Sequence, residues 1–181
     1  PAPAIYQALY QRLIENTFQD EIGDELFPSF LDFLELGHSG GLYAVLEDPA
    51  STYWDDRATP DVETRDKVFL ASLTEAVELL SSRQGKDVNA WDWRTLHGVP
   101  FDHPMGAREP LGWLFRRGPV PFGGSTYTVA NAVVSLRTPF ATPLGTSFRF
   151  LAGLSDADQS RSVVPTGASG HGRHLHAARV E

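Results

Sequence analysis

The strongest helix signal in the chain lies between residues 59 and 85, which read TPDVETRDKVFLASLTEAVELLSSRQG. Thr59 has a side-chain oxygen suited to capping a helix N-terminus, Pro60 has the fixed φ of a first helical position, and acidic residues follow in the first turn. Apolar residues then recur at the spacing of one helix face: Phe69, Leu73, Ala76, Val77 and Leu80. The sequence predicts one long helix that starts at Thr59 and closes near Gly85, a residue type that favours helix termination.

Two further helical runs precede this stretch. Ile5, Leu9 and Leu13 are spaced four residues apart and place apolar side chains on one helix face. Residues 24–36 are rich in leucine and phenylalanine and are followed by Gly37, a natural C-cap. We therefore expect residues 1–90 to be mainly helical.

The amino-acid composition changes from about Trp91. Five prolines are spaced too closely for a helix, so residues 91–125 are predicted to be a loop region: Pro100, Pro104, Pro110, Pro119 and Pro121. Two strand-like runs follow at 127–136 and 146–154, so residues 126–181 are predicted to be rich in antiparallel strands. The whole is an α+β chain whose three parts belong to one larger domain.

The composition argues against several classes of partner and binding site. The chain has 181 residues, a formal net charge of −8 and no cysteine. An acidic protein lacks the basic face that nucleic acid or an anionic membrane surface requires, so neither is expected as a partner. Without cysteine there is no disulfide framework and no thiolate metal site. No apolar run approaches the ~18–20 residues needed to cross a bilayer.

The charge is divided unevenly along the chain. Residues 1–110 contain 8 Lys and Arg against 20 Asp and Glu, a net of −12, whereas residues 111–181 contain 7 against 3, a net of +4. A basic, strand-rich part is typical of a segment that packs against other protein, although a single asymmetric domain fits too. Strands with open edges would also favour self-association.

Residues 37–41, Gly-His-Ser-Gly-Gly, match the Gly-x-Ser-x-Gly pattern of a nucleophile elbow. An elbow needs a buried strand before the serine, but residues 32–36 continue a helical pattern, so a helix C-cap followed by a turn is the preferred interpretation. An esterase using Ser39 is the alternative. A serine-reactive phosphonate would label that residue, and Ser39→Ala should abolish its activity.

Other motifs also have simpler interpretations. The imidazoles of His171, His174 and His176 are close enough in sequence to suggest a metal, but their spacing fits no standard zinc pattern and a surface loop is preferred. The stretch 123–125, Gly-Gly-Ser, lacks the following helix and lysine of a phosphate-binding loop and is predicted to be a tight turn. Trp91, Trp93 and Trp113 are interpreted as core anchors rather than a ligand platform.

Taken together, several stretches resemble the penicillin acylase (penicillin amidase) family of N-terminal nucleophile hydrolases, and their order and spacing cover most of residues 42–171. They are Glu47-Asp48-Pro49, Tyr53 to Asp56, Thr59-Pro60, Glu63 to Arg65, Trp91 to Trp93, Leu96-His97, Phe101 to Gly106, Arg117 to Pro119, Gly123 to Ser125, Thr128-Val129, Ser147 to Phe150, Asp156 to Ser160 and Pro165 to His171.

The resemblance implies that this chain is a C-terminal fragment of the family's β chain and part of an αββα sandwich. Such an enzyme hydrolyses a linear amide through an acyl-enzyme on the β chain's N-terminal serine, whose α-amine is the general base. Pro1 offers neither a hydroxyl nor a primary amine, so the nucleophile is expected outside these residues, as are the oxyanion donors and any calcium ligands. The expected partners are the α chain and the N-terminal part of the β chain, and the expected compartment is the periplasm or the exterior.

The sequence departs from the family pattern in three places. The usual Gly-Asp before Thr128 is Thr126-Tyr127, and the asparagine expected directly after Val129 is displaced to Asn131. Residues 173–179 replace the family's usual ending, and together these departures suggest truncation at both ends. We therefore assign no catalytic, substrate-binding or metal residue within the chain. Scaffold roles are predicted for Trp91, Trp93, His97, His103, Pro104, Gly123, Gly124 and Thr128. The alternative function is a non-catalytic protein-binding or assembly module.

Overall fold

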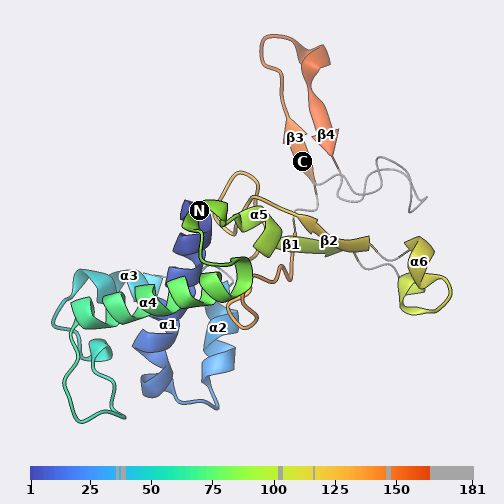
Figure 1. Cartoon of the computed structure of the whole chain (residues 1–181). Coiled ribbons are helices and arrows are strands. Elements are labelled where there is room, and N and C mark those ends of the chain that lie inside the picture. The colour runs from blue at the N-terminus through green and yellow to red at the C-terminus, as the bar shows by residue number, and fades with distance from the viewer. Residues whose placement is uncertain (36, 38–39, 102–103, 116, 146–147, 164–181) are drawn as a thin grey trace. The chain divides into compact units, whose positions relative to one another are not determined.

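The computed structural model describes residues 1–35, 37, 40–101, 104–115, 117–145 and 148–163 (Figure 1). The chain forms two compact units. The helical unit consists of residues 1–93 and a returning segment, 135–139; the strand unit consists of residues 94–134 and the described residues from Phe140 onward. Helices dominate the first unit and short antiparallel strand pairs occur in the second, which confirms the predicted α+β class.

The helical unit is built from α1 (Ala2–Ile22), α2 (Phe27–Glu35), α3 (Gly40–Glu47) and α4 (Arg65–Gln84). Helix α1 packs against both α2 and α4, and Figure 1 shows α4 crossing α1. An apolar cluster lies between the elements of this unit. Its buried members are Leu13, Ile14, Phe18, Phe27, Leu31, Leu34, Leu42, Val45, Trp54, Val68 and Leu136.

Helix α4 starts at Arg65, so the start predicted at Thr59 is wrong. The Thr59 hydroxyl donates to Glu63 Oε1 at 2.9 Å, and the Asp56 N–H donates to Glu63 Oε2 at 3.1 Å. These side chains close a loop ahead of the helix, and Thr64 is the cap: its hydroxyl accepts a hydrogen bond from the Lys67 N–H at 3.4 Å.

The predicted end of α4 is confirmed. Gly85 follows the last helical residue with φ of 85°, and its N–H donates to the Ser81 carbonyl at 2.9 Å. The buried face of the helix differs from the predicted one, because Val68, Ser72, Ala76 and Leu80 are buried while Phe69 and Val77 are each 38% exposed. The small side chains of Ser72 and Ala76 lie on this buried face.

The two earlier helices agree with their predicted positions. Helix α1 includes the predicted run at residues 5–13 and extends to Ile22. Helix α2 lies inside the predicted 24–36 stretch, and Gly37 follows it with φ of 98° and an N–H that donates to the Leu34 carbonyl at 3.0 Å. A left-handed conformation of this kind explains the glycine.

The strand unit corrects the prediction that residues 91–125 are loop. That stretch contains α5 (Trp93–Leu96), β1 (Gly98–Phe101), α6 (Gly112–Phe115) and β2 (Arg117–Pro121). Strands β1 and β2 pair antiparallel, with a register shift between Val99 and Phe101. Both are edge strands of a two-stranded sheet, where prolines are tolerated because half of the N–H groups need no partner in the ladder.

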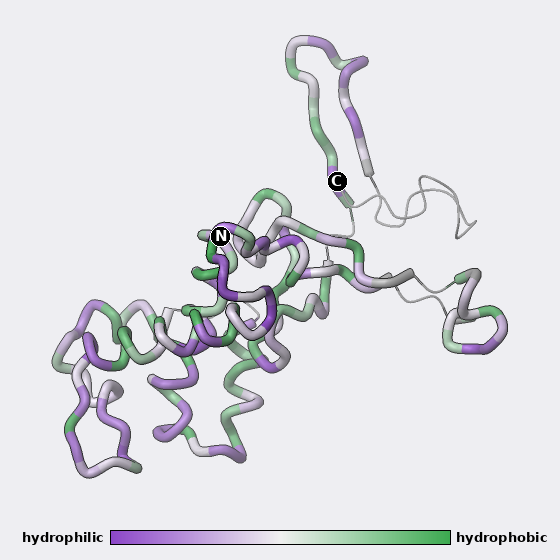
Figure 2. Tube along the Cα trace, viewed as in Figure 1, coloured by the Kyte–Doolittle hydropathy of each residue, from purple (hydrophilic) through white to green (hydrophobic). Residues whose placement is uncertain are grey.

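The strand predicted at 127–136 is wrong. Within the described residues this stretch takes part only in isolated bridges, Ser125 with Asn131 and Ala132 with Gly145. Among the described residues of the strand predicted at 146–154, Arg149–Leu151 form β3, which pairs antiparallel with β4 (Arg161–Val163). Figure 2 shows β3 as the more apolar of the two strands. None of the described helices is both long and apolar enough to span a bilayer.

Helices α1 and α4 are also joined by polar contacts. Asn16 Nδ2 donates to Ser72 Oγ and to Glu75 Oε2, both at 3.1 Å. Burial raises the pKa of the neighbouring Glu15 carboxyl, against the opposing effects of Arg12 and Gln11 and with a smaller contribution from Glu75. The charged form of Glu15 is therefore disfavoured in the folded chain.

This pKa shift predicts a pH-dependent stability. Because the folded chain binds the Glu15 proton more tightly than the unfolded chain, the free energy of unfolding should fall as pH rises above 4.5, the ordinary value for this group. Glu15→Gln removes the titration, so the variant should gain stability relative to the parent sequence between pH 4 and pH 7. Urea denaturation at each pH measures the difference, with Glu78→Gln at an exposed position of α4 as control. A difference that does not change with pH would contradict the prediction.

Candidate functional site

His97 lies directly before β1 and is fully buried. Its Nε2 is 2.8 Å from Thr142 Oγ1, and its Nδ1 is 3.4 Å from the Phe122 carbonyl oxygen. The Phe122 N–H donates to the His97 carbonyl at 3.0 Å, which extends the β1–β2 ladder by one residue pair. We call His97, Phe122 and Thr142 the His97 cluster.

Burial lowers the pKa of the His97 imidazole, and the backbone of Phe122 and of Val133 opposes this effect. The neutral ring is therefore favoured. Because Nδ1 faces a carbonyl oxygen, which can only accept, Nδ1 is assigned the proton and Nε2 accepts from the Thr142 hydroxyl.

A hydroxyl 2.8 Å from an imidazole has the distance expected of an activated nucleophile and its base. Access decides against that chemistry here, since Thr142 is only 5% exposed and His97 has no exposed surface. A substrate carbonyl could not approach the hydroxyl in this conformation. The geometry is that of a scaffold residue, the role predicted for His97.

Two of the three predicted aromatic anchors are buried in the structure. Trp91 is 2% exposed and its Nε1–H donates to the Gly85 carbonyl at 2.8 Å, so it closes the end of α4. Trp93 is buried at the start of α5. Trp113, in contrast, is 64% exposed, so its assignment as a core anchor is wrong for this structure. Pro104 begins a 3₁₀ turn, and His103 lies outside the described residues.

The tight turn predicted at 123–125 lies instead at Thr126 and Tyr127, directly after the Gly-Gly-Ser stretch. A Cβ on Gly124 would lie 1.6 Å from the Ala130 carbonyl oxygen, so only glycine fits there. The Thr128 hydroxyl accepts from the Ser125 N–H at 2.9 Å and contacts the Ala130 carbonyl oxygen at the same distance. A turn follows the glycines, whereas a phosphate-binding loop would require a helix.

The structure also bears on the nucleophile-elbow pattern. Helix α2 precedes it and α3 begins at Gly40, so the strand-to-helix context of an elbow is absent around the described residues of this stretch. His38 and Ser39, like the histidines at 171, 174 and 176, lie outside the described part of the chain. Among the residues that are described, no group of three or more histidines and carboxylates could hold a metal ion.

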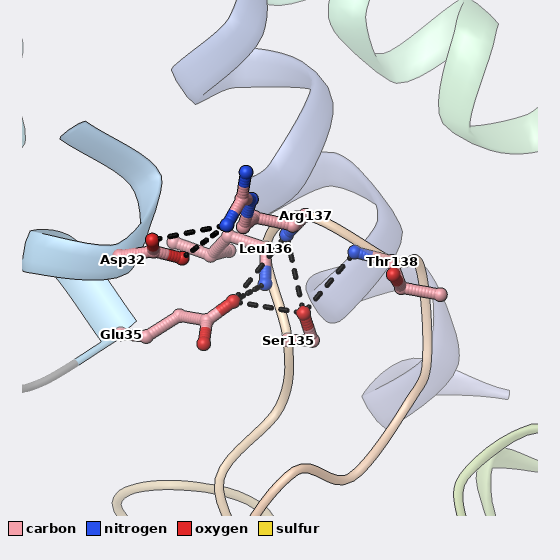
Figure 3. Close-up of polar contacts among 6 residues, drawn as sticks. All are labelled: Asp32, Glu35, Ser135, Leu136, Arg137 and Thr138. Carbon is pink, nitrogen blue, oxygen red and sulfur yellow. Dashed lines mark hydrogen bonds and ion pairs between the residues drawn. The ribbon is translucent and has the colours of Figure 1, made fainter. Parts of the chain in front are cut away.

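The sequence analysis assigns no role to Glu35, the last residue of α2, yet this residue organises the returning segment (Figure 3). Its Oε1 accepts from Ser135 Oγ at 2.8 Å, from the Leu136 N–H and from the Arg137 N–H at 3.3 Å. The Ser135 hydroxyl in turn accepts from the Arg137 and Thr138 N–H groups at 3.2 and 3.1 Å. One carboxylate thus fixes a whole turn of backbone.

Two further contacts fix the same turn. Arg137 pairs with Asp32 at 3.1 Å, and Gln11 Nε2 donates to the Leu136 carbonyl at 3.2 Å. The Arg137 pair is half exposed and contributes little. A sequence signal for Glu35 did exist: a carboxylate at a helix C-terminus opposes the helix dipole, which indicates a specific partner.

Comparison with known proteins identifies the family. The profile of the penicillin amidase family matches residues 1–179. The chain belongs to the penicillin amidase family. This confirms the resemblance seen over residues 42–171 and extends it to the helices before them.

Relatives of this penicillin amidase chain are named acylases. An acyl-homoserine lactone acylase QuiP of Pseudomonas putida is 29% identical over 176 residues, which are 96% of this chain and 21% of the relative. A protein of the same name in Pseudomonas aeruginosa is 28% identical over 190 residues, 97% of this chain and 22% of the relative. A penicillin acylase 2 proenzyme of Pseudomonas sp. strain SE83 is 36% identical over 110 residues, 59% of this chain and 14% of the relative. The chain spans about a fifth of the length of the first two relatives.

Glu35 should be essential to the helical unit of this penicillin amidase chain. Glu35→Ala removes the acceptor of three donors and leaves the N–H of buried Leu136 without it, so the free energy of unfolding should fall by about 2–3 kcal/mol. Tryptophan fluorescence in urea measures the change. Glu47→Ala is the matched control, because Glu47 also ends a helix, α3, but is exposed. Equal effects of the two changes would contradict the anchoring role.

Gly124 should tolerate no side chain. Gly124→Ala places a methyl group against the Ala130 backbone, so the turn must rearrange at a cost of about 3 kcal/mol or more. Hydrogen exchange of the Ala132 amide, which donates to the Ser125 carbonyl, should report the opening of the turn. Gly41→Ala in α3, where a Cβ meets nothing within 4 Å, should keep or raise stability. Unchanged exchange at Ala132 in Gly124→Ala would refute this prediction.

Proposed function

We propose that this chain is the C-terminal part of an acylase that hydrolyses a linear amide, and that the acyl-enzyme forms on an N-terminal serine outside these residues. Two observations support this: the family match covers residues 1–179, and longer relatives, of which the matched residues make up 21% and 14%, are named acylases. The substrate class we propose is an amide that joins an acyl chain to an amine-bearing nucleus.

Because the His97 cluster is buried, we assign the reaction to another part of the protein. Of the described residues, His97 and Thr142 come closest to a base and nucleophile, and both are enclosed. We assign the described residues to the framework and the reaction to a serine whose own α-amine takes its proton. The proposed partners are the α chain and the N-terminal part of the β chain, together forming an αββα sandwich, with any calcium held by residues outside this chain.

The test uses the complete gene. A Ser, Thr or Cys next to a self-cleavage junction should lie upstream of these codons, and its replacement by alanine should abolish both the cleavage, seen by intact mass, and acyl release from an N-acyl-homoserine lactone or a penicillin. Loss of acyl release should reach about 10³-fold or more. Ser39→Ala is the control and should retain both. Retained activity in the upstream variant, or phosphonate labelling of Ser39, would overturn the proposal.

One observation favours a second candidate function, a protein-binding module. Apolar side chains on and beside β3 are exposed, with Phe150 at 59%, Leu151 at 69% and the Phe148 ring stacked 6.5 Å from that of Phe150. Exposed apolar groups next to a strand edge suit a protein partner. This function predicts a gene without an upstream nucleophile and a chain that forms a stable monomer or defined oligomer alone, as sedimentation would show.

A further inference from the structure

We infer that His97 is an acid-sensitive latch that holds residues 140–145 against the β1–β2 pair of the strand unit. The inference concerns the strand unit alone and does not depend on which amide the acylase hydrolyses.

The first step is that His97 ties two segments 45 residues apart in the sequence. Thr142 lies in the middle of residues 140–145, and its hydroxyl meets His97 Nε2 at 2.8 Å. The segment is also joined to residues 132–133, because the Val133 N–H donates to the Leu144 carbonyl at 2.8 Å and Ala132 bridges to Gly145. His97 supplies a side-chain hydrogen bond between this segment and the start of β1.

The second step is that the latch accommodates a neutral ring better than a charged one. If Nε2 gains a proton it becomes a donor, and the Thr142 hydroxyl can rotate to accept from it, so the hydrogen bond itself survives. The cost is the burial of a positive charge at a residue with no exposed surface. That cost is why the pKa of His97 is lowered from its ordinary value of 6.5.

The third step is that the charged side chains described near the cluster are cations. The Arg149 guanidinium of β3 lies 5.0 Å from the centre of the Phe122 ring, and the His97 ring lies 6.0 Å from the same centre. The Arg94 side chain of α5 is the near neighbour of Gly123, the residue after Phe122. Neither arginine could offset a positive charge on the buried His97 ring.

The direction of the pH effect follows from the lowered pKa. The stabilisation by neutral His97 is complete above pH 6.5, the value expected in the open chain, and is lost as pH falls from there toward the pKa in the closed chain. Across that window the equilibrium constant for opening should rise by up to about tenfold per pH unit, the limit for uptake of one proton. Opening would free residues 140–145 from the start of β1.

Hydrogen exchange of the 181-residue chain between pH 5 and pH 8 tests the latch. After correction for intrinsic exchange, the amides of Val133 and Phe122 should open more often as pH falls, while the Leu80 amide in α4 serves as the internal control. His97→Gln keeps a neutral donor and acceptor at this position, so its Val133 amide should show no such pH dependence. A rise of equal size in His97→Gln, or no rise in the original chain, would overturn the inference.

A second measurement covers the case in which His97→Gln does not fold. The ring C2 proton of His97 can be titrated by NMR in the unchanged chain. An apparent pKa below 6.5 is expected, together with the rise in Val133 exchange. A pKa at or above 6.5 would overturn the latch whatever the behaviour of the variant.

Discussion

The carboxylate of Glu35 joins parts of the chain that are 100 residues apart, and the helical unit depends on it. It collects the Ser135 hydroxyl and two backbone N–H groups at the end of α2, and so places Leu136 in the apolar cluster that α1 and α2 share. Without this carboxylate the donors of the returning backbone would have to be satisfied by water. In return, the same donors offset the repulsion between the carboxylate and the C-terminal end of the α2 dipole. The distant segment therefore belongs to the helical unit for an electrostatic reason rather than through any strand or helix of its own.

In the strand unit the corresponding constraint is the close approach of other chain atoms to two glycines. A Cβ on Gly98 would lie 2.5 Å from Pro119 Cβ, and one on Gly124 would lie 1.6 Å from the Ala130 carbonyl oxygen. These contacts bring Phe122 beside His97, and the apolar group of Val99, Phe122 and Ala132 forms around them. The sheet of this unit is short, so it has few backbone hydrogen bonds between strands. Side-chain hydrogen bonds of His97 and Thr128 hold the neighbouring segments together instead.

Local patterns predicted α1, α2 and the end of α4, because helical spacing and a glycine C-cap act within a few residues. They did not predict α3, which begins at Gly40 where a turn was expected. They failed for α4's first residue, where Thr59 and Thr64 are both good caps and a contact from Glu63 selects the second. They failed again for 127–136, which has strand composition but ends in a turn bound to a carboxylate 100 residues away. Family membership was accessible from the order of short motifs, whereas the Glu35 contact depends on tertiary structure and had only the helix dipole as its signal.

Whether a hydroxyl and an imidazole can react depends on the access of a substrate to them as well as on the distance between them. The His97 and Thr142 side chains satisfy the distance for nucleophile and base as well as many active sites do, and a neutral imidazole with a lowered pKa could take a proton. The same burial that lowers the pKa also excludes a substrate carbonyl from the hydroxyl. Burial thus converts a pair that could react into one that fastens two segments together, and a penicillin amidase chain can contain a well-aligned hydroxyl and imidazole that serve only its framework.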